Sequence, residues 1–390
     1  MAATPMLFAP MTIRGLTLRN RIVLSPMLTY CAEAGHTTDF HFMHLGKFAV
    51  GGCGLVFMES TKVDPRGCTT PRDCGLWKDE FVPALSRITA FVKAQGAAIG
   101  IQLGHSGRKA RNSLPWEGRA PLASHPGVDH GEAWELVAPS AIAAAPGVAV
   151  PRALTIAEIH AMIAEFGAAA ARADRAGFDV LELHGAHGYL VHQFLSPTAN
   201  QRDDAYGGSR ANRLRFAIEI AEETRRHWPA DKPLFFRVSA VDEDGGTLED
   251  TIALCRELRA VGVDVIDCSS GGMTPRSIVD SGRKHGYGYQ VPYAARIRAE
   301  AEIATMAVGL IIHADQAEAI LRAGDADLIA VGREMLQNPN WALDAAEKLG
   351  AEKPYATVPP AYGYWLEKRT QAGFGGRPST WQPGIEGNAS

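Results

Sequence analysis

The sequence predicts a single (β/α)8 TIM barrel with an inserted loop region after the third strand and a C-terminal extension. Eight short runs of apolar and β-branched residues recur along the 390 residues, and most precede a stretch with helical periodicity. The runs are almost continuously apolar, as expected for parallel strands buried on both faces. Eight strand–helix units favour closure into a barrel. A Rossmann fold is the weaker alternative, because no strand is followed by the G-x-G-x-x-G pattern.

The predicted strands have apolar interiors and end in polar or small residues. They cover residues 21–25, 54–59, 98–103, 179–184, 233–239, 264–269, 308–313 and 327–332. Helix boundaries carry their own signals. Thr155 and Thr247 each stand three positions before an acidic residue and are predicted helix N-caps. Gly177 and Gly262 follow helical stretches and are predicted C-terminal caps.

The interval between the third and fourth strands contains segment 104–150, which is rich in Pro, Gly, Arg and Trp. It follows the C-terminal end of a strand, where barrels place their chemistry, so it is predicted to form a lid or substrate wall. The alternative is a surface excursion without a role. We expect one catalytic barrel domain over residues 1–366 and a tail over residues 367–390 that is disordered or lies at a subunit interface.

Composition narrows the class of partner to a small molecule. The formal net charge of -4 gives no basic footprint for nucleic acid. The longest nearly apolar run, 141–150, is too short to cross a membrane. The six cysteines form no C-x-x-C pair, which predicts reduced thiols, a cytoplasmic location and no zinc or other metal.

The fourth strand ends in a cluster of residues suited to acid–base chemistry, His184, His187 and Tyr189. Two imidazole N–H groups can stabilise negative charge on a carbonyl oxygen, and a nearby phenol can supply a proton. Two other interpretations stay open. The histidines could be core residues, or they could bind a metal with Glu182, as in a metal-dependent barrel lyase or isomerase.

Two further strands end in polar residues. Arg237 lies inside an apolar run and requires an anionic partner, either a protein carboxylate or an electron-rich ring system. Gln102 offers an amide donor and acceptor to a heterocycle. Gly309 near the start of the seventh strand, and Gly332 with Arg333 after the eighth, predict a phosphate site. A phosphate-ligand-binding barrel without catalysis would also fit these residues.

Taken together, these motifs resemble the Old Yellow Enzyme family, and most closely its bacterial YqjM-like subgroup of ene-reductases. The resemblance covers residues 8–365. Its motifs are residues 19–27, 101–109, 184–189, 194–197 and 200–213. It implies an FMN-dependent ene-reductase that takes hydride from NADPH or NADH and passes it from flavin N5 to the β-carbon of an activated alkene such as an enone. It also implies a homodimer or homotetramer.

The resemblance assigns a role to each matching residue. The flavin contacts are Ser25, Pro26, Met27, Ser60, Gln102 and Arg237, with Gly309, Gly332 and Arg333 at the phosphate. The substrate contacts are His184 and His187 at the carbonyl oxygen and Tyr30 as a second aromatic contact, with Tyr189 as the proton donor to the α-carbon.

The sequence departs from the subgroup at two places. Leu28 stands where a cysteine commonly contacts the flavin and tunes its potential, so the potential and substrate preference are expected to differ. Near the C-terminus, the subgroup often presents an arginine to the partner subunit from a motif that ends in Arg-Gly-Trp. Segment 359–365 lacks that motif. Either Tyr364 or Trp365 takes the place of the arginine, the dimer is built differently, or these aromatic residues pack in the core.

Overall fold

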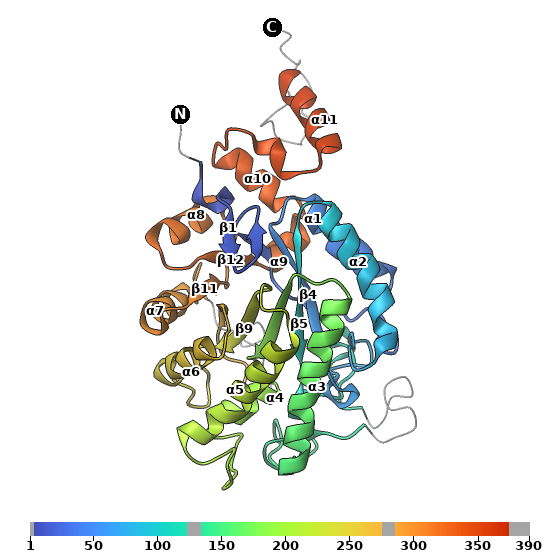
Figure 1. The fold of residues 1–390 in the computed structure, drawn as a ribbon, viewed down its shortest axis with the longest axis vertical. Helices are drawn as coiled ribbons and strands as arrows, with labels where there is room; N and C mark the ends of the chain where they lie inside the picture. Colours follow the sequence, from blue (N-terminus) through green and yellow to red (C-terminus); the bar gives the residue numbers. More distant parts are fainter. Residues whose placement is uncertain (1–3, 123–133, 275–284, 374–390) are drawn as a thin grey trace.

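A closed barrel of eight parallel strands forms the centre of the computed structural model, which describes residues 4–122, 134–274 and 285–373 (Figure 1). In the order in which they neighbour one another, the strands are β3 (Ile22–Leu24), β4 (Leu55–Lys62), β5 (Ala98–Gly104), β8 (Val180–Gly185), β9 (Leu234–Ser239), β10 (Val265–Ser269), β11 (Ala304–Ala307) and β12 (Leu328–Val331). The predicted fold class is confirmed.

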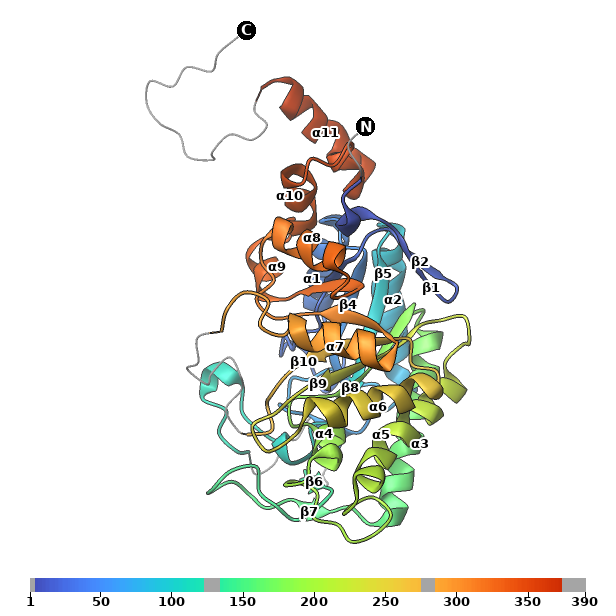
Figure 2. The same ribbon diagram turned by 90° about the vertical axis from the view of Figure 1, so that its left-hand side faces the viewer.

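Helices cover the outside of the barrel (Figures 1 and 2). The α-helices of the described residues are α1 (Asp39–Val50), α2 (Val82–Ala94), α3 (Ile156–Arg175), α4 (Leu190–Leu195), α5 (Arg210–His227), α6 (Leu248–Ala260), α7 (Val291–Ala301), α8 (Ala314–Ala323), α9 (Arg333–Gln337), α10 (Trp341–Lys348) and α11 (Pro360–Gln371), of which α11 stands away from the barrel. Thr155 and Thr247 cap α3 and α6 as predicted, each accepting a backbone N–H. No helix in the described ranges is both long and apolar enough to cross a membrane.

The seventh strand lies earlier in the chain than predicted. β11 covers Ala304–Ala307, whereas the apolar run 308–313 forms the loop that follows it. The prediction was wrong because Gly309 has a φ of 114° and Leu310 a φ of 52°, and this left-handed backbone cannot continue a strand. The second barrel strand, β4, runs three residues beyond its predicted end at Glu59, to Lys62.

The barrel interior changes character along the strands. Near their N-terminal ends, Val23, Phe57, Phe235 and Met306 belong to one buried apolar cluster. The hairpin of β1 (Met11–Ile13) and β2 (Leu16–Leu18) adds Ile13 and Leu18 to this cluster and closes that end. Further along the same strands the buried inward residues are polar: Gln102, Glu182, Arg237 and Asp267. The inward residues that could take part in a reaction therefore lie at the C-terminal end of the barrel.

Two regions lie outside the barrel. The insertion after β5 contains the short strands β6 (Val137–Ala138) and β7 (Arg152–Ala153), and β6 lies beside α4 (Figure 2). At the opposite end, α11 projects beyond α10 and continues through the predicted domain boundary at 366/367 (Figures 1 and 2). Tyr364 and Trp365 are 55% and 70% exposed, so their alternative assignment to the core is wrong. Residues 374–390 of the predicted tail lie outside the described part of the chain.

Candidate active site

A cavity of about 690 Å³ lies at the C-terminal ends of the barrel strands. This volume suits a ligand of cofactor size. Segments 108–121 and 144–148 of the insertion form part of its wall, as predicted for the long loop. The predicted site residues that line it are Ser25, Pro26, Met27, Tyr30, His187, Tyr189, Arg237, Gly309, Gly332 and Arg333, and Leu28 lines it as well.

Three predicted site residues, Ser60, Gln102 and His184, are absent from the cavity wall and are buried. His184 nevertheless contacts the wall directly. Its ring centroid lies 5.1 Å from that of His187 and 4.9 Å from that of Tyr189. Gln102 uses its amide nitrogen to bind Glu182, at 2.7 Å. The structure thus brings the two histidines and the tyrosine together and places Gln102 and Ser60 in the layer of buried residues.

Both imidazoles are held neutral. Burial lowers the pKa of His184 and of His187 well below the usual range, and the nearby Arg237 guanidinium lowers both further. The backbone N–H of Ala186 donates to Nδ1 of His184 at 3.2 Å, so the ring proton lies on Nε2. Nε2 of His187 lies 2.7 Å from the hydroxyl of Ser269, which fixes the orientation of that ring. The pair can offer hydrogen bonds without carrying charge.

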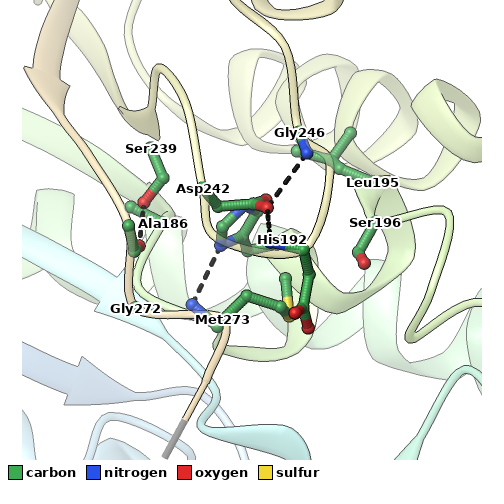
Figure 3. A network of polar contacts seen from close by, with 12 residues as sticks. Ala186, His192, Leu195, Ser196, Ser239, Asp242, Gly246, Gly272 and Met273 are labelled. Atoms are coloured by element: carbon green, nitrogen blue, oxygen red, sulfur yellow. Dashed lines mark hydrogen bonds and ion pairs between the residues drawn. The ribbon is translucent and has the colours of Figure 1, made fainter. Parts of the chain in front are cut away.

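A histidine–aspartate pair, His192 and Asp242, supports the turn that carries these residues. The backbone N–H of Gly188 donates to Nδ1 of His192 at 2.9 Å, so Nε2 carries the proton and donates to Asp242 at 3.1 Å. The N–H of Gly246 donates to the same carboxylate at 3.0 Å (Figure 3). Burial alone would raise the pKa of Asp242, but these hydrogen bonds lower it. His192 and Asp242 therefore hold the turn between His187 and Tyr189 in place.

Lys109, on the insertion, supports the same turn from the cavity side. Its Nζ donates to the carbonyl oxygens of His187 at 3.1 Å and Thr274 at 2.9 Å, and also to that of Gly272. Burial lowers the pKa of Lys109 to about 8. Sequence reasoning included Lys109 in a motif but gave it no role, because its partners lie 78 or more positions away.

Arg237 faces a protein carboxylate and the cavity at once. Its Nη1 lies 3.1 Å from Oδ2 of Asp267 and donates to the hydroxyl of Ser25 at 3.2 Å. Burial raises the pKa of Asp267 and, more strongly, that of Glu182, and the Arg237 charge opposes both shifts. Nε of Arg237 is buried without a hydrogen-bond partner in the described structure. This donor is available to an acceptor on a bound ligand.

Gly309 and Gly332 line another part of the cavity, called here the glycine-lined end. A Cβ at Gly309 would lie 2.6 Å from Nε2 of Gln290, and the φ of 114° also requires glycine. A Cβ at Gly332 would point at the cavity residues Met27 and Ser25. Arg333 lines the cavity and forms no ion pair with another described residue. Exposed backbone and an unpaired guanidinium suit a phosphate group.

The described residues include one cluster with metal-binding atom types, His41, Glu59 and Cys74, which contacts segment 26–30 through Thr29. Nδ1 of His41 accepts the N–H of Thr38 at 3.0 Å, so Nε2 carries a proton and donates to Glu59 at 3.2 Å. Cys74 also donates to Glu59, at 3.0 Å. Glu59 in turn accepts the N–H of Thr29. The cluster is a hydrogen-bond network that anchors this segment, and the absence of a metal stays a prediction.

Comparison with known proteins identifies the family. The model of the NADH:flavin oxidoreductase / NADH oxidase family matches residues 6–352. The chain belongs to this family. It is 45% identical over 349 residues to an NADPH dehydrogenase of Geobacillus sp. (strain WCH70), covering 88% of this chain and 95% of the relative. It is 44% identical over 352 residues to an NADPH dehydrogenase of Bacillus subtilis (strain 168), covering 89% and 96%.

Solved structures agree with this assignment. Morphinone reductase matches with a TM-score of 0.72 and 25% identity, covering 90% of this chain and 91% of that chain. The resemblance to the Old Yellow Enzyme family is confirmed, and the protein is an NAD(P)H-dependent flavin oxidoreductase whose cofactor is FMN. The unpaired donor of Arg237, the glycine-lined end and Arg333 fit that cofactor.

Proposed function

We propose that the protein is an ene-reductase, which uses NADPH or NADH to reduce the activated carbon–carbon double bond of a small molecule such as an enone. One observation carries this proposal. His187 and Tyr189, with His184 directly behind them, share a single cavity with Arg237 and the glycine-lined end. A group that binds a carbonyl oxygen and a group that can give a proton therefore lie beside the residues suited to the flavin.

The residues proposed to hold FMN surround the cavity or lie just beneath it. They are Ser25, Pro26 and Met27 at the ring, Ser60 and Gln102 at its polar edge, Arg237 beside its negative charge, and Gly309, Gly332 and Arg333 at the phosphate. When bound, FMN supplies hydride from N5 to the β-carbon of the alkene. The buried guanidinium of Arg237, with its free donor, would stabilise negative charge on the bound cofactor.

The substrate side is proposed to work through neutral donors. Nε2–H of His184 and the imidazole of His187 donate to the substrate carbonyl oxygen, where negative charge grows as hydride arrives. Tyr189 gives its phenolic proton to the α-carbon. Tyr30 provides an aromatic contact, and its ring meets that of Trp116 in the insertion with centroids 5.8 Å apart.

The earlier alternatives find no support in the geometry. A metal-dependent lyase or isomerase would need His184, His187 and Glu182 as ligands. Among the described residues, however, these three do not bring their ligand atoms together as a group that could hold a metal ion, and Nε2 of His187 is paired with the hydroxyl of Ser269. A barrel that only binds a phosphate ligand would not explain why two neutral histidines and Tyr189 lie together at the cavity.

An anaerobic titration tests the proposal. The purified protein is expected to be yellow, to lose its flavin absorbance with NADPH or NADH, and to regain it when a cyclic enone is added, with the saturated ketone as product. Reoxidation by oxygen or a quinone alone, with no turnover of an enone, nitroalkene or other activated alkene, would contradict the proposal.

We also propose a homodimer or homotetramer that works in the cytoplasm. Tyr362, Tyr364 and Trp365 expose more than half of their surface on α11, which supports contact with another copy of the chain. All six cysteines are free, which supports a reducing compartment. Light scattering of the full chain and of a Trp365→Ala variant tests the assembly, and a wild-type monomer would contradict it.

A further inference from the structure

Lys62 is a fully buried lysine at the C-terminal end of β4 that the proposed function does not use. Its Nζ donates to the hydroxyl of Ser60 at 3.0 Å and lies 3.6 Å from Oδ2 of Asp73. The same Nζ is 5.3 Å from the centroid of the Tyr189 ring. Burying an ammonium group is costly, and lysine is almost never fully buried without a partner. The position therefore requires an explanation.

Asp73 is the counter-ion, but it does not bind Lys62 tightly. Its carboxylate accepts the N–H of Thr69 at 2.6 Å and the hydroxyl of Thr70 at 2.8 Å, and these bonds fix it in place. The 3.6 Å separation leaves the ammonium closer to Ser60 than to its counter-ion. A buried ion pair of this kind is rarely more stabilising than well-packed apolar residues. Stability alone does not account for the pair.

The charges around Tyr189 single out Lys62. His184 and His187 are neutral because burial lowers the pKa of both. Burial raises the pKa of Tyr30, so that phenol stays neutral too. Lys109 has its Nζ directed at three backbone carbonyls. Among the charged groups of the described residues near Tyr189, the ammonium of Lys62 is the one that lies over the ring itself, within the range at which a cation and an aromatic ring attract each other.

We propose that Lys62, held by Asp73, is a positioning residue that promotes proton delivery by Tyr189. This inference rests on the proposed function. In that step the O–H bond of Tyr189 breaks, and the proton forms a C–H bond with the electron pair on the α-carbon of the hydride-reduced substrate. The phenolate that remains regains a proton from water. Negative charge grows on the ring during this step, and the neighbouring ammonium stabilises it.

Stopped-flow measurements on the FMN-loaded enzyme test the role of Lys62. Lys62→Met is expected to leave flavin reduction by NADPH within about two-fold of wild type and to slow reoxidation by a cyclic enone by about ten-fold. Reoxidation by a quinone should be unchanged, because it needs no proton at carbon. Lys232→Met is the matched control, since Lys232 pairs with Asp174 at 2.7 Å away from the cavity, and both half-reactions should be unaffected.

The Tyr189→Phe variant separates this inference from the proposed function. In that background Lys62→Met should cause no further slowing with the enone, because the group on which it acts is gone. Equal slowing in both backgrounds, or equal slowing with enone and quinone, would overturn the role of Lys62 while leaving Tyr189 as the donor. If Tyr189→Phe itself reoxidises at the wild-type rate with the enone, the assignment of the proton donor fails.

A second variant covers the case in which Lys62→Met does not fold because Asp73 is left unpaired. Lys62→Met with Asp73→Asn removes both charges and keeps the planar shape of the side chain and one of its two acceptor oxygens. It should show the same ten-fold loss, specific to the enone, as the single variant. Wild-type reoxidation by the enone in this double variant would overturn the inference.

Discussion

The two halves of the barrel interior are equally buried and chemically opposite. In the N-terminal half, Phe57 and Phe235 meet with ring centroids 5.8 Å apart in an apolar cluster closed by the β1–β2 hairpin. In the C-terminal half, Arg237 lies on β9 two residues beyond Phe235, and it faces Asp267 on the neighbouring strand β10. The difference shows a division of labour. Burial of the apolar half stabilises the fold. Burial of the polar half costs free energy, because its charged groups lose their hydration, but it places these groups beside the ligand in a site without bulk water.

The apolar half is tested most strongly by Phe235→Ala. This change should lower the free energy of unfolding by about 4 kcal/mol, because it leaves a cavity in a layer with no exposed side chain. Urea denaturation of the holoenzyme measures the loss, and the flavin spectrum should be unchanged. Val150→Ala is the exposed control and should have an effect below about 0.5 kcal/mol. If Phe235→Ala lowered the free energy of unfolding by less than about 1 kcal/mol, the apolar half would not be the part of the barrel that provides stability.

Arg237→Met probes the polar half. It should cost about 3 kcal/mol of stability, because Asp267 and Glu182 lose the charge that opposes their desolvation. It should also weaken FMN retention during gel filtration. Adding Asp267→Asn should restore most of the stability and none of the FMN retention. If both properties recover together, Arg237 serves the fold rather than the cofactor.

Glu182→Gln sharpens the comparison through its pH dependence. Burial raises the pKa of Glu182 well above its ordinary value of 4.5, so the folded state holds a proton that the unfolded state releases. Stability from this group is present below pH 4.5 and is lost as the pH rises through the folded value, at up to about 1.4 kcal/mol per pH unit.

Glutamine keeps the acceptor for Gln102 and does not ionise, so the variant should gain stability over wild type as the pH increases from 5 to 8. Thermal unfolding across this range measures the difference. The exposed control Glu222→Gln should show a flat difference. A flat difference for Glu182→Gln as well would mean that burial does not favour its protonated form.

Leu28→Cys should have the smallest effect. Leu28 lines the cavity beside Met27, so a thiol there would change the surroundings of the flavin without altering the reaction class. The expected shift in flavin potential is on the order of 30 mV, equivalent to about 1.4 kcal/mol for a two-electron couple. Leu28→Ala controls for volume. No change in potential or in preference among enones would remove the idea that this departure tunes the enzyme.

The fold could be predicted largely because parallel strands buried on both faces leave an apolar signature. The seventh strand was misplaced because the run 308–313 carries the same signature, although the left-handed backbone at Gly309 and Leu310 ends the strand before it. An apolar run indicates that a segment is buried. It does not indicate whether the backbone is extended, because that depends on packing that a single sequence does not reveal.

The site residues at the strand ends could be predicted from the sequence. The residues that hold them in position by hydrogen bonds could not. The cluster of His184, His187 and Tyr189 is local in sequence and was predicted to meet. The partner of His192, by contrast, lies 50 positions away at Asp242, and nothing local indicates it. Lys62 was missed because the predicted strand ended at Glu59, which hid the fact that a lysine closes a fully buried strand.

The most direct test of the account compares the two half-reactions of Tyr189→Phe. Reduction of the flavin by NADPH should stay close to wild type, and reoxidation by a cyclic enone should slow by about 100-fold, the lower range for the loss of a general acid. The account predicts this asymmetry because the proposed function assigns Tyr189 and the histidines to the substrate, and Arg237 and the glycine-lined end to the flavin. Equal slowing of both half-reactions, or no slowing of either, would contradict it.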